Sequence, residues 1–126
     1  MDLLLDTQVL IWWDTNDANL PAAFRAAIVS PANPIHISAG TVWEIAIKRA
    51  SGKLSFSGSA AKAIEEHGFL SLPITVRHAE WAGQLPAYHR DPFDRLLVAQ
   101  AHLEALTLLT VGDQILRYQI PHLQAH

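Results

Sequence analysis

Four acidic residues stand where predicted strands end or where predicted helices begin. Asp6 directly follows the first apolar run of the chain, and Asp113 follows a later one. Glu44 and Asp94 lie in the first turns of two helical segments. Carboxylate oxygens are preferred ligands of Mg²⁺, and a bound Mg²⁺ polarises a phosphate and lowers the pKa of a bound water. If these acids meet in space, phosphodiester hydrolysis is the chemistry they would support.

Each acid also has a local explanation as a helix cap. Asp6 fits an N-cap, Thr41–Glu44 and Asp91–Asp94 each fit a capping box, and Thr110–Asp113 can be read in the same way. The helix dipole stabilises an acid in a first turn by about 0.3–1 kcal/mol. Capping does not require the acids to converge, however, and carboxylates within a few ångströms of one another repel. Convergence would therefore indicate a divalent cation.

Short apolar runs alternate with longer helical stretches along the chain. The strand candidates are Leu3–Leu5, Ile35–Ile37, part of Phe69–Ile74, Leu106–Leu109 and, as a possible edge strand, Ile120–Leu123. The predicted helices are Thr7–Trp13, Ala22–Val29, Ser38–Ala50, Ser59–His67, Val76–Leu85 and Pro92–Leu103, with a helical turn over Gln114–Tyr118. This alternation predicts an α/β fold, a parallel sheet with helices on both faces. Right-handed crossovers place all strand-to-helix turns on the same side of the sheet. Asp94 can join the other acids there only if its helix begins on that side.

The composition fits one globular domain over residues 1–126. Half of the 126 residues are hydrophobic, 17% are charged, and no cysteine is present, which excludes disulfides and thiolate metal sites. The net charge of −3 argues against binding nucleic acid through bulk positive charge, but not against an enzyme that meets it locally. No apolar run approaches the ~20 residues of a membrane span, and the N-terminus lacks the basic region of a signal peptide. We expect a soluble, cytoplasmic protein.

Over nearly its whole length the chain resembles the PIN-domain family, specifically the VapC toxins of bacterial toxin–antitoxin pairs. The resemblance rests on Leu3–Thr7 with Trp12-Trp13, on Ser38 with Thr41–Lys48 and Gly52–Leu54, and on His89–Leu97 with Ala99–Ala101, Leu108–Thr110 and Tyr118. The stretch from His89 is the most specific. The resemblance implies a three-layer α/β/α fold with a central parallel sheet, an acidic Mg²⁺ or Mn²⁺ site, and endonucleolytic cleavage of RNA.

By this resemblance the first three acids of the site are Asp6, Glu44 and Asp94. We expect Asp6 and Asp94 to bind the metal directly, and Glu44 to orient or deprotonate the attacking water or to complete the shell around the metal ligands. The hydroxyls of Thr7 and Thr110 match polar positions beside the site, where they would position water or phosphate.

The chain departs from the family at the fourth acid. The family usually has an acid two residues after the threonine that matches Thr110, whereas this chain has Gly112 there and Asp113 one residue later. A shift of one residue at a helix start rotates a side chain by roughly 100°. Either Gly112 lets the turn reshape so that Asp113 reaches the site, or three acids and water hold the metal.

The neighbouring charged and aromatic residues have two readings each. We expect Asp91 to be an N-cap, with a supporting role at the site as the alternative. We expect Arg95 to form an ion pair with Asp94 or Asp91, with a substrate contact as the alternative. The basic residues Lys48, Arg49, Lys53 and Arg90 either meet RNA phosphates or are solvated helix and loop ends. The seven histidines show no metal-ligand spacing. Trp12 and Trp13 are adjacent on one helix, so only one is expected to face inward and the other to lie in an interface.

Two alternatives to the nuclease remain open. One is a degenerate PIN domain that acts only as a binding module, which Gly112 favours. The other is a phosphoacceptor receiver domain, which is disfavoured because no lysine follows Leu109. For the nuclease, the resemblance implies an RNA substrate, a small antitoxin that docks in the active-site groove, and a homodimer.

Overall fold

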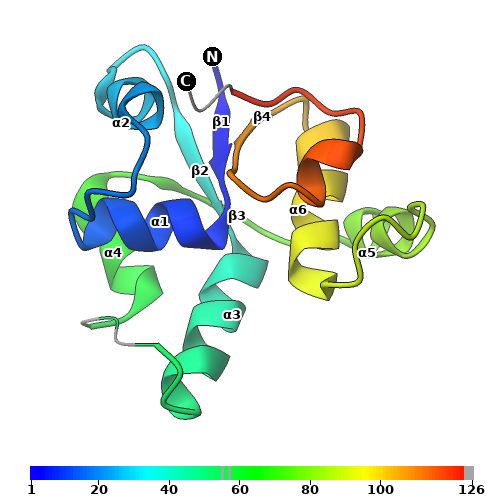
Figure 1. The fold of residues 1–126 in the computed structure, drawn as a ribbon, viewed down its shortest axis with the longest axis horizontal. Helices are drawn as coiled ribbons and strands as arrows, with labels where there is room; N and C mark the ends of the chain where they lie inside the picture. The colour runs from blue at the N-terminus through cyan, green and yellow to red at the C-terminus, as the bar shows by residue number, and fades with distance from the viewer. Residues whose placement is uncertain (55, 57, 124–126) are drawn as a thin grey trace.

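Four parallel strands form the central sheet. A computed structural model describes residues 1–54, 56 and 58–123 of the chain. The strands are β1 (Leu3–Leu5), β2 (Ile35–Ser38), β3 (Leu70–Leu72) and β4 (Thr107–Leu109), in the spatial order β3-β2-β1-β4 (Figure 1). All three neighbouring pairs run parallel. The predicted parallel sheet is confirmed.

The helices connect and cover these strands. They are α1 (Thr7–Asp14), α2 (Ala22–Val29), α3 (Ala39–Ala50), α4 (Ala60–His67), α5 (Val76–Gly83) and α6 (Pro92–Leu103), followed by the short 3₁₀ helix η1 (Ile115–Arg117). Each predicted helix agrees with the observed one to within two residues at either end, which is the usual uncertainty of helix boundaries. Local capping explains this agreement. For example, the Ser59 side chain accepts from Lys62 N–H, and Gly68 ends α4 with a left-handed φ of 71°.

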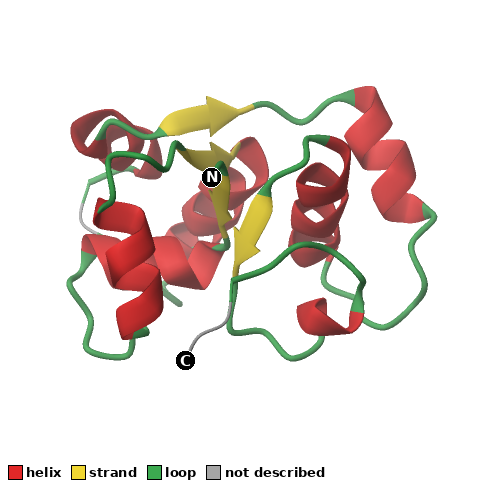
Figure 2. Cartoon of the chain, turned by 90° about the horizontal axis from the view of Figure 1, so that it is seen from above, coloured by secondary structure: helices red, strands yellow, loops and turns green. Residues whose placement is uncertain are grey.

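Strands β1, β2 and β4 are largely buried, whereas the edge strand β3 is largely exposed, and alternating side chains of β1 enter two different cores. Leu3 and Leu5 join the core formed with α1, α2 and α4, whereas Leu4 joins the core formed with α6, β4 and η1. Figure 2 shows the strands lying between these two groups of helices. This confirms the three-layer α/β/α architecture and explains why β1 and β4 read as continuous apolar runs.

Two expectations about the periphery are wrong. Instead of an edge strand over Ile120–Leu123, only an isolated parallel bridge joins Leu108 to His122 within the described residues. Trp12 and Trp13 are both partly buried and both pack against the first core, so neither turns fully away from it. The exposed tryptophan is Trp43 on α3, with 61% of its surface accessible.

In the described part of the chain, no helix has the length and apolar character needed to span a bilayer.

Candidate active site

The carboxyl ends of β1 and β4 place two polar residues next to each other. The strands pair in parallel with Leu5 opposite Leu109, and the Asp6 N–H donates to the Leu109 carbonyl at 3.1 Å. Asp6 and Thr110 therefore follow neighbouring strand ends at the same edge. In open parallel sheets, ligands bind beyond the carboxyl ends of the strands.

A cleft of about 220 Å³ opens at this edge, and acids from three helices line it. Asp6 comes from the start of α1, Glu44 from α3, and Asp94 from the first turn of α6, with Asp91 just before it. The structure thus brings together the three acids expected from the sequence. Asp94 lies in the cleft because α6 begins at the carboxyl edge of the sheet, although no strand immediately precedes α6.

Asp6 serves as a helix cap and lines the cleft at the same time. One of its oxygens accepts from the Val9 N–H at 2.8 Å, and its side chain is almost fully buried. Burial raises the pKa of Asp6 to about 6; hydrogen bonds from Thr110 and Val9 oppose this rise, whereas the charges of Asp94 and Glu44 add to it. Capping and convergence with the other acids, which looked like alternatives in the sequence, occur together at Asp6.

Glu44 is a buried acid with two donors inside the protein. Its Oε1 accepts from the Thr7 hydroxyl at 2.6 Å, and its Oε2 accepts from Lys48 Nζ at 2.7 Å, one helical turn further along α3. The Thr7 hydroxyl also lies 3.2 Å from the hydroxyl of Thr41. The bond to Glu44 raises the pKa of Lys48, which keeps a positive charge on the cleft wall. The capping box at Thr41–Glu44 is not formed, because Ser38 caps α3 instead.

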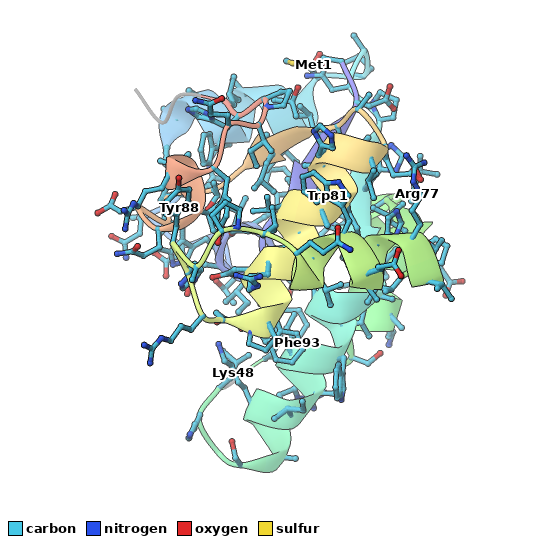
Figure 3. The ribbon with its side chains drawn as sticks, turned by 90° about the vertical axis from the view of Figure 1, so that its right-hand side faces the viewer. Met1, Lys48, Arg77, Trp81, Tyr88 and Phe93 are labelled. Atoms are coloured by element: carbon cyan, nitrogen blue, oxygen red, sulfur yellow. The ribbon has the colours of Figure 1, made fainter. Side chains whose placement is uncertain are left out.

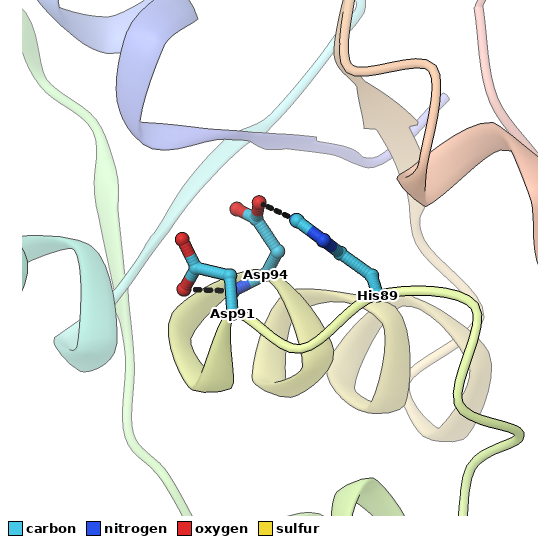
Figure 4. A group of neighbouring side chains, drawn as sticks. All are labelled: His89, Asp91 and Asp94. Atoms are coloured by element: carbon cyan, nitrogen blue, oxygen red, sulfur yellow. Dashed lines mark hydrogen bonds and ion pairs between the residues drawn. The ribbon is translucent and has the colours of Figure 1, made fainter.

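Asp94 has His89 on one side and Asp91 on the other (Figure 4). His89 Nε2 lies 2.6 Å from Asp94 Oδ2, while Asp91 caps α6 by accepting from the N–H groups of Phe93 and Asp94. Burial raises the pKa of Asp94, His89 opposes the rise, and the charges of Asp91 and Glu44 add to it. The expected N-cap at Asp91 is confirmed.

The expected ion pair of Arg95 is wrong. Its guanidinium instead donates to backbone carbonyls of the segment before α6, with the shortest bonds to Ala82 at 2.8 Å, Leu85 at 3.0 Å and His89 at 3.1 Å. Arg95 therefore fastens this segment to α6. Asp94, beside it in sequence, pairs with His89 rather than with Arg95.

The fourth acid does not join the site. Asp113 is exposed and is not one of the described residues that line the cleft, whereas Gly112 and Val111 do line it. The Thr110 hydroxyl accepts from the Gly112 N–H at 3.0 Å, which folds the chain back at this point. Of the two alternatives left by the sequence, the structure shows the three expected acids in the cleft, with Asp91 beside them and without Asp113.

His89 is the residue that the sequence analysis missed. It forms a group with Asp91 and Asp94 whose potential ligand atoms all lie within 4.8 Å of one another. The spacing His-x-Asp-x-x-Asp is the signal that would have suggested it. Spacings among histidines alone do not reveal this group, because its other two members are aspartates.

The donor chemistry of the cleft fits a hard divalent cation. Asp6 and Asp94 are carboxylates whose negative charge is disfavoured by burial and by neighbouring acids, which raises the pKa of both. A divalent cation relieves such repulsion, and Mg²⁺ prefers carboxylate oxygens. Asp6 and Asp94, with Glu44 beside them, are the residues that would hold it.

Several solved structures share this fold. VapBC2 from Rickettsia felis bound to a promoter DNA fragment matches with a TM-score of 0.71 and 14% identity, over 98% of this chain and 98% of that chain. A toxin–antitoxin complex from Klebsiella pneumoniae matches with a TM-score of 0.67 and 21% identity, over 98% of both chains. VapBC-1 from nontypeable Haemophilus influenzae matches with a TM-score of 0.64 and 18% identity, over 99% of this chain and 98% of that chain.

Curated protein sequences show no match to the chain. The sequence model of the PIN domain does match, and it spans residues 3–120. That match covers every strand, every helix and the whole acidic cleft. The chain therefore belongs to the PIN domain family.

Proposed function

We propose that this protein is a Mg²⁺-dependent endoribonuclease of the VapC toxin type, with Mn²⁺ as a possible alternative metal, that hydrolyses RNA phosphodiester bonds. The observation that carries the proposal is the meeting of Asp6, Glu44 and Asp94 in one cleft at the carboxyl edge of the sheet. Gathering three acids in one cleft, with Asp6 and Glu44 buried, costs folding free energy, so a site of this kind calls for a functional explanation.

Each side chain has a distinct role in this proposal. Asp6 and Asp94 hold the metal ion, which when bound would polarise the scissile phosphate and lower the pKa of a water. Glu44 keeps Thr7 and Lys48 in place, and the remaining lone pairs of its carboxylate orient the attacking water. The Lys48 ammonium faces the same cleft and attracts an RNA phosphate. The Thr110 hydroxyl steadies Asp6.

A protein partner is part of the proposal. The chains of similar fold come from toxin–antitoxin complexes, which supports a small cognate antitoxin. Next to the cleft, a groove of about 390 Å³ runs between α3 and α6, with Ile47, Lys48, Arg90 and Phe93 among its lining residues. Lys48 and Phe93 lie on the same side of the molecule in Figure 3. The exposed Trp43 packs edge-on against Phe93, with 5.3 Å between the ring centroids. An exposed aromatic pair beside the groove supports contact with an antitoxin or with a second copy of the chain. We place the protein and these contacts in the cytoplasm.

RNA cleavage by the purified protein tests the nuclease. Wild type should cleave a cellular RNA pool with Mg²⁺ and lose this activity in EDTA. Asp6→Asn and Asp94→Asn should each lose at least ~100-fold, since the metal supplies several kcal/mol of transition-state stabilisation. Asp113→Asn is the matched control and should cleave like wild type. Full metal-dependent cleavage by Asp6→Asn or Asp94→Asn would refute the assignment.

The same assay separates the second candidate, a PIN domain that binds partners without catalysis. The exposed position of Asp113 and the glycine at position 112 favour this candidate. Folded wild-type protein that binds Mg²⁺ and an antitoxin, but cuts no RNA under any condition, would establish it. The phosphoacceptor receiver is wrong, because the chain belongs to the PIN domain family.

A further inference from the structure

Two hydrogen bonds hold the backbone of His89, and a third contact holds its imidazole. Its backbone N–H donates to the Tyr118 hydroxyl at 3.2 Å, and its carbonyl accepts from Arg95 Nη1 at 3.1 Å. Its imidazole Nε2 lies 2.6 Å from Asp94 Oδ2. A functional side chain needs such support, because neighbouring groups must fix its orientation before it can bind anything.

The groups that hold His89 are themselves anchored. The Tyr118 hydroxyl donates to the Pro86 carbonyl at 2.6 Å, and Arg95 also donates to the carbonyls of Ala82 and Leu85. Starting helix α6 does not require this arrangement, since Asp91 already caps it. The bonds instead fix the path of the segment that carries His89.

The imidazole lies within metal-ligand range of two carboxylates. The potential ligand atoms of His89, Asp91 and Asp94 all lie within 4.8 Å of one another. Two ligands on one ion are separated by at most about 4.4 Å, twice a bond of about 2.2 Å, so the outer limit of this spacing lies slightly above that of a bound ion and small side-chain rotations would close it. Asp94 is also one of the two acids that we propose to hold the catalytic metal.

We propose that His89 supplies a nitrogen ligand to the ion held by Asp94, so that the site favours Mn²⁺ over Mg²⁺ more strongly than carboxylates alone would. The inference rests on the proposed metal-dependent function. Mg²⁺ binds oxygen ligands and keeps several waters, whereas imidazole nitrogen is a good ligand for first-row transition ions. Removing the imidazole should therefore weaken Mn²⁺ binding much more than Mg²⁺ binding.

The test measures binding rather than activity. Mn²⁺ is titrated into the full-length protein at pH 7.5 and followed by electron paramagnetic resonance, and Mg²⁺ affinity is obtained by competition. We expect His89→Gln to weaken Mn²⁺ binding by ~10-fold or more and to change Mg²⁺ binding by less than about 3-fold. His102→Gln is the control, because it removes an exposed histidine from the far end of the same helix.

A spectroscopic readout on wild type makes the test independent of how the variants fold. Pulsed electron paramagnetic resonance of the Mn²⁺ complex should show coupling to a directly bound ¹⁴N, and His89→Gln should lose it. Absence of ¹⁴N coupling in wild type, or equal weakening of both metals by His89→Gln, overturns the inference and leaves His89 as a partner of Asp94 only. If Asp94→Asn binds both metals like wild type, the proposed metal site fails as well.

Discussion

The Thr7 hydroxyl donates a 2.6 Å hydrogen bond to Oε1 of Glu44, which ties the first turn of α1 to α3 at the cleft. Both residues are buried, so bulk water replaces the bond poorly. We predict that Thr7→Val, which keeps the shape of the side chain, lowers the free energy of unfolding by about 1–3 kcal/mol. Urea denaturation measures this loss.

Thr15→Val is the matched control for Thr7→Val. Thr15 also makes a short hydrogen bond, at 2.7 Å to the Ile11 carbonyl, but in an exposed place at the other end of α1. Its loss should cost less, because water can hydrogen-bond to the freed carbonyl. Equal losses of unfolding free energy in the two variants would show that the Thr7–Glu44 bond stabilises the fold no more than an exposed bond does.

The metal-free protein should lose stability as the pH rises from about 4 to 7. The pKa of Asp6 is about 6 in the folded protein against an ordinary value of 3.8, so between these values the folded state keeps a proton that the unfolded chain releases. Rising pH therefore lowers the free energy of unfolding over this range. The difference of about 2 pKa units corresponds to a loss on the order of 3 kcal/mol.

Asp6→Asn isolates this effect, because asparagine caps a helix about as well as aspartate. The variant should be more stable than wild type at pH 7.5 in EDTA and should show a flatter pH profile. Asp113→Asn, at an exposed acid outside the cleft, should follow wild type. Thermal unfolding across the pH range gives the comparison. Superimposable profiles for wild type and Asp6→Asn would contradict a raised pKa at Asp6.

Mg²⁺ should stabilise wild type, because an ion that binds only the folded state shifts the unfolding equilibrium. At a concentration of 100 times its Kd the gain is about 2.7 kcal/mol. We expect Asp94→Asn to lose most of this gain and Asp113→Asn to keep it. Unfolding with and without Mg²⁺ at pH 7.5 measures both. A gain in Asp94→Asn as large as that in wild type would remove Asp94 from the metal site.

Lys48→Met should weaken RNA binding through the loss of one phosphate contact. In an Asp94→Asn background, which prevents cleavage, we expect the slope of log affinity against log salt concentration to fall by about 0.7. Fluorescence anisotropy with a short single-stranded RNA measures the slope. Lys62→Met is the control, because Lys62 makes a similar pair with Glu66 on α4, away from the cleft. Equal slopes for the two variants would show that Lys48 makes no contact with an RNA phosphate and serves only as the partner of Glu44.

The secondary structure could be predicted because short-range interactions decide it. Asp91 caps α6 through Phe93 and Asp94, residues two and three positions away, and Pro92 stands at the first helical position. Asp6 caps α1 through Val9 in the same way. Such contacts are readable in sequence order. The continuous apolar runs of β1 and β4 predicted strands that are covered on both faces. Side chains point to alternate faces of a strand, so a strand buried on both faces is apolar at every position.

The partners of Arg95 and His89 could not be predicted in this way. Arg95 contacts carbonyls that precede it by 6 to 13 positions, along a segment with no repeating pattern. An arginine beside two aspartates suggests an ion pair by charge alone, but backbone carbonyls compete for the same donors. The chain path decides between them, and that path is set by packing of the segment against α6 and Tyr118.

The sequence by itself determined the order of strands and helices, the parallel sheet and the acids available to a site. Only the tertiary structure decided that Asp6, Glu44 and Asp94 share a cleft with Lys48, that His89 stands beside Asp94, and that Asp113 remains outside. The physical reason is one of range. Helices, strands and caps depend on neighbours within a few residues, whereas a site of this size depends on where three separate chain segments place their side chains, to within about an ångström.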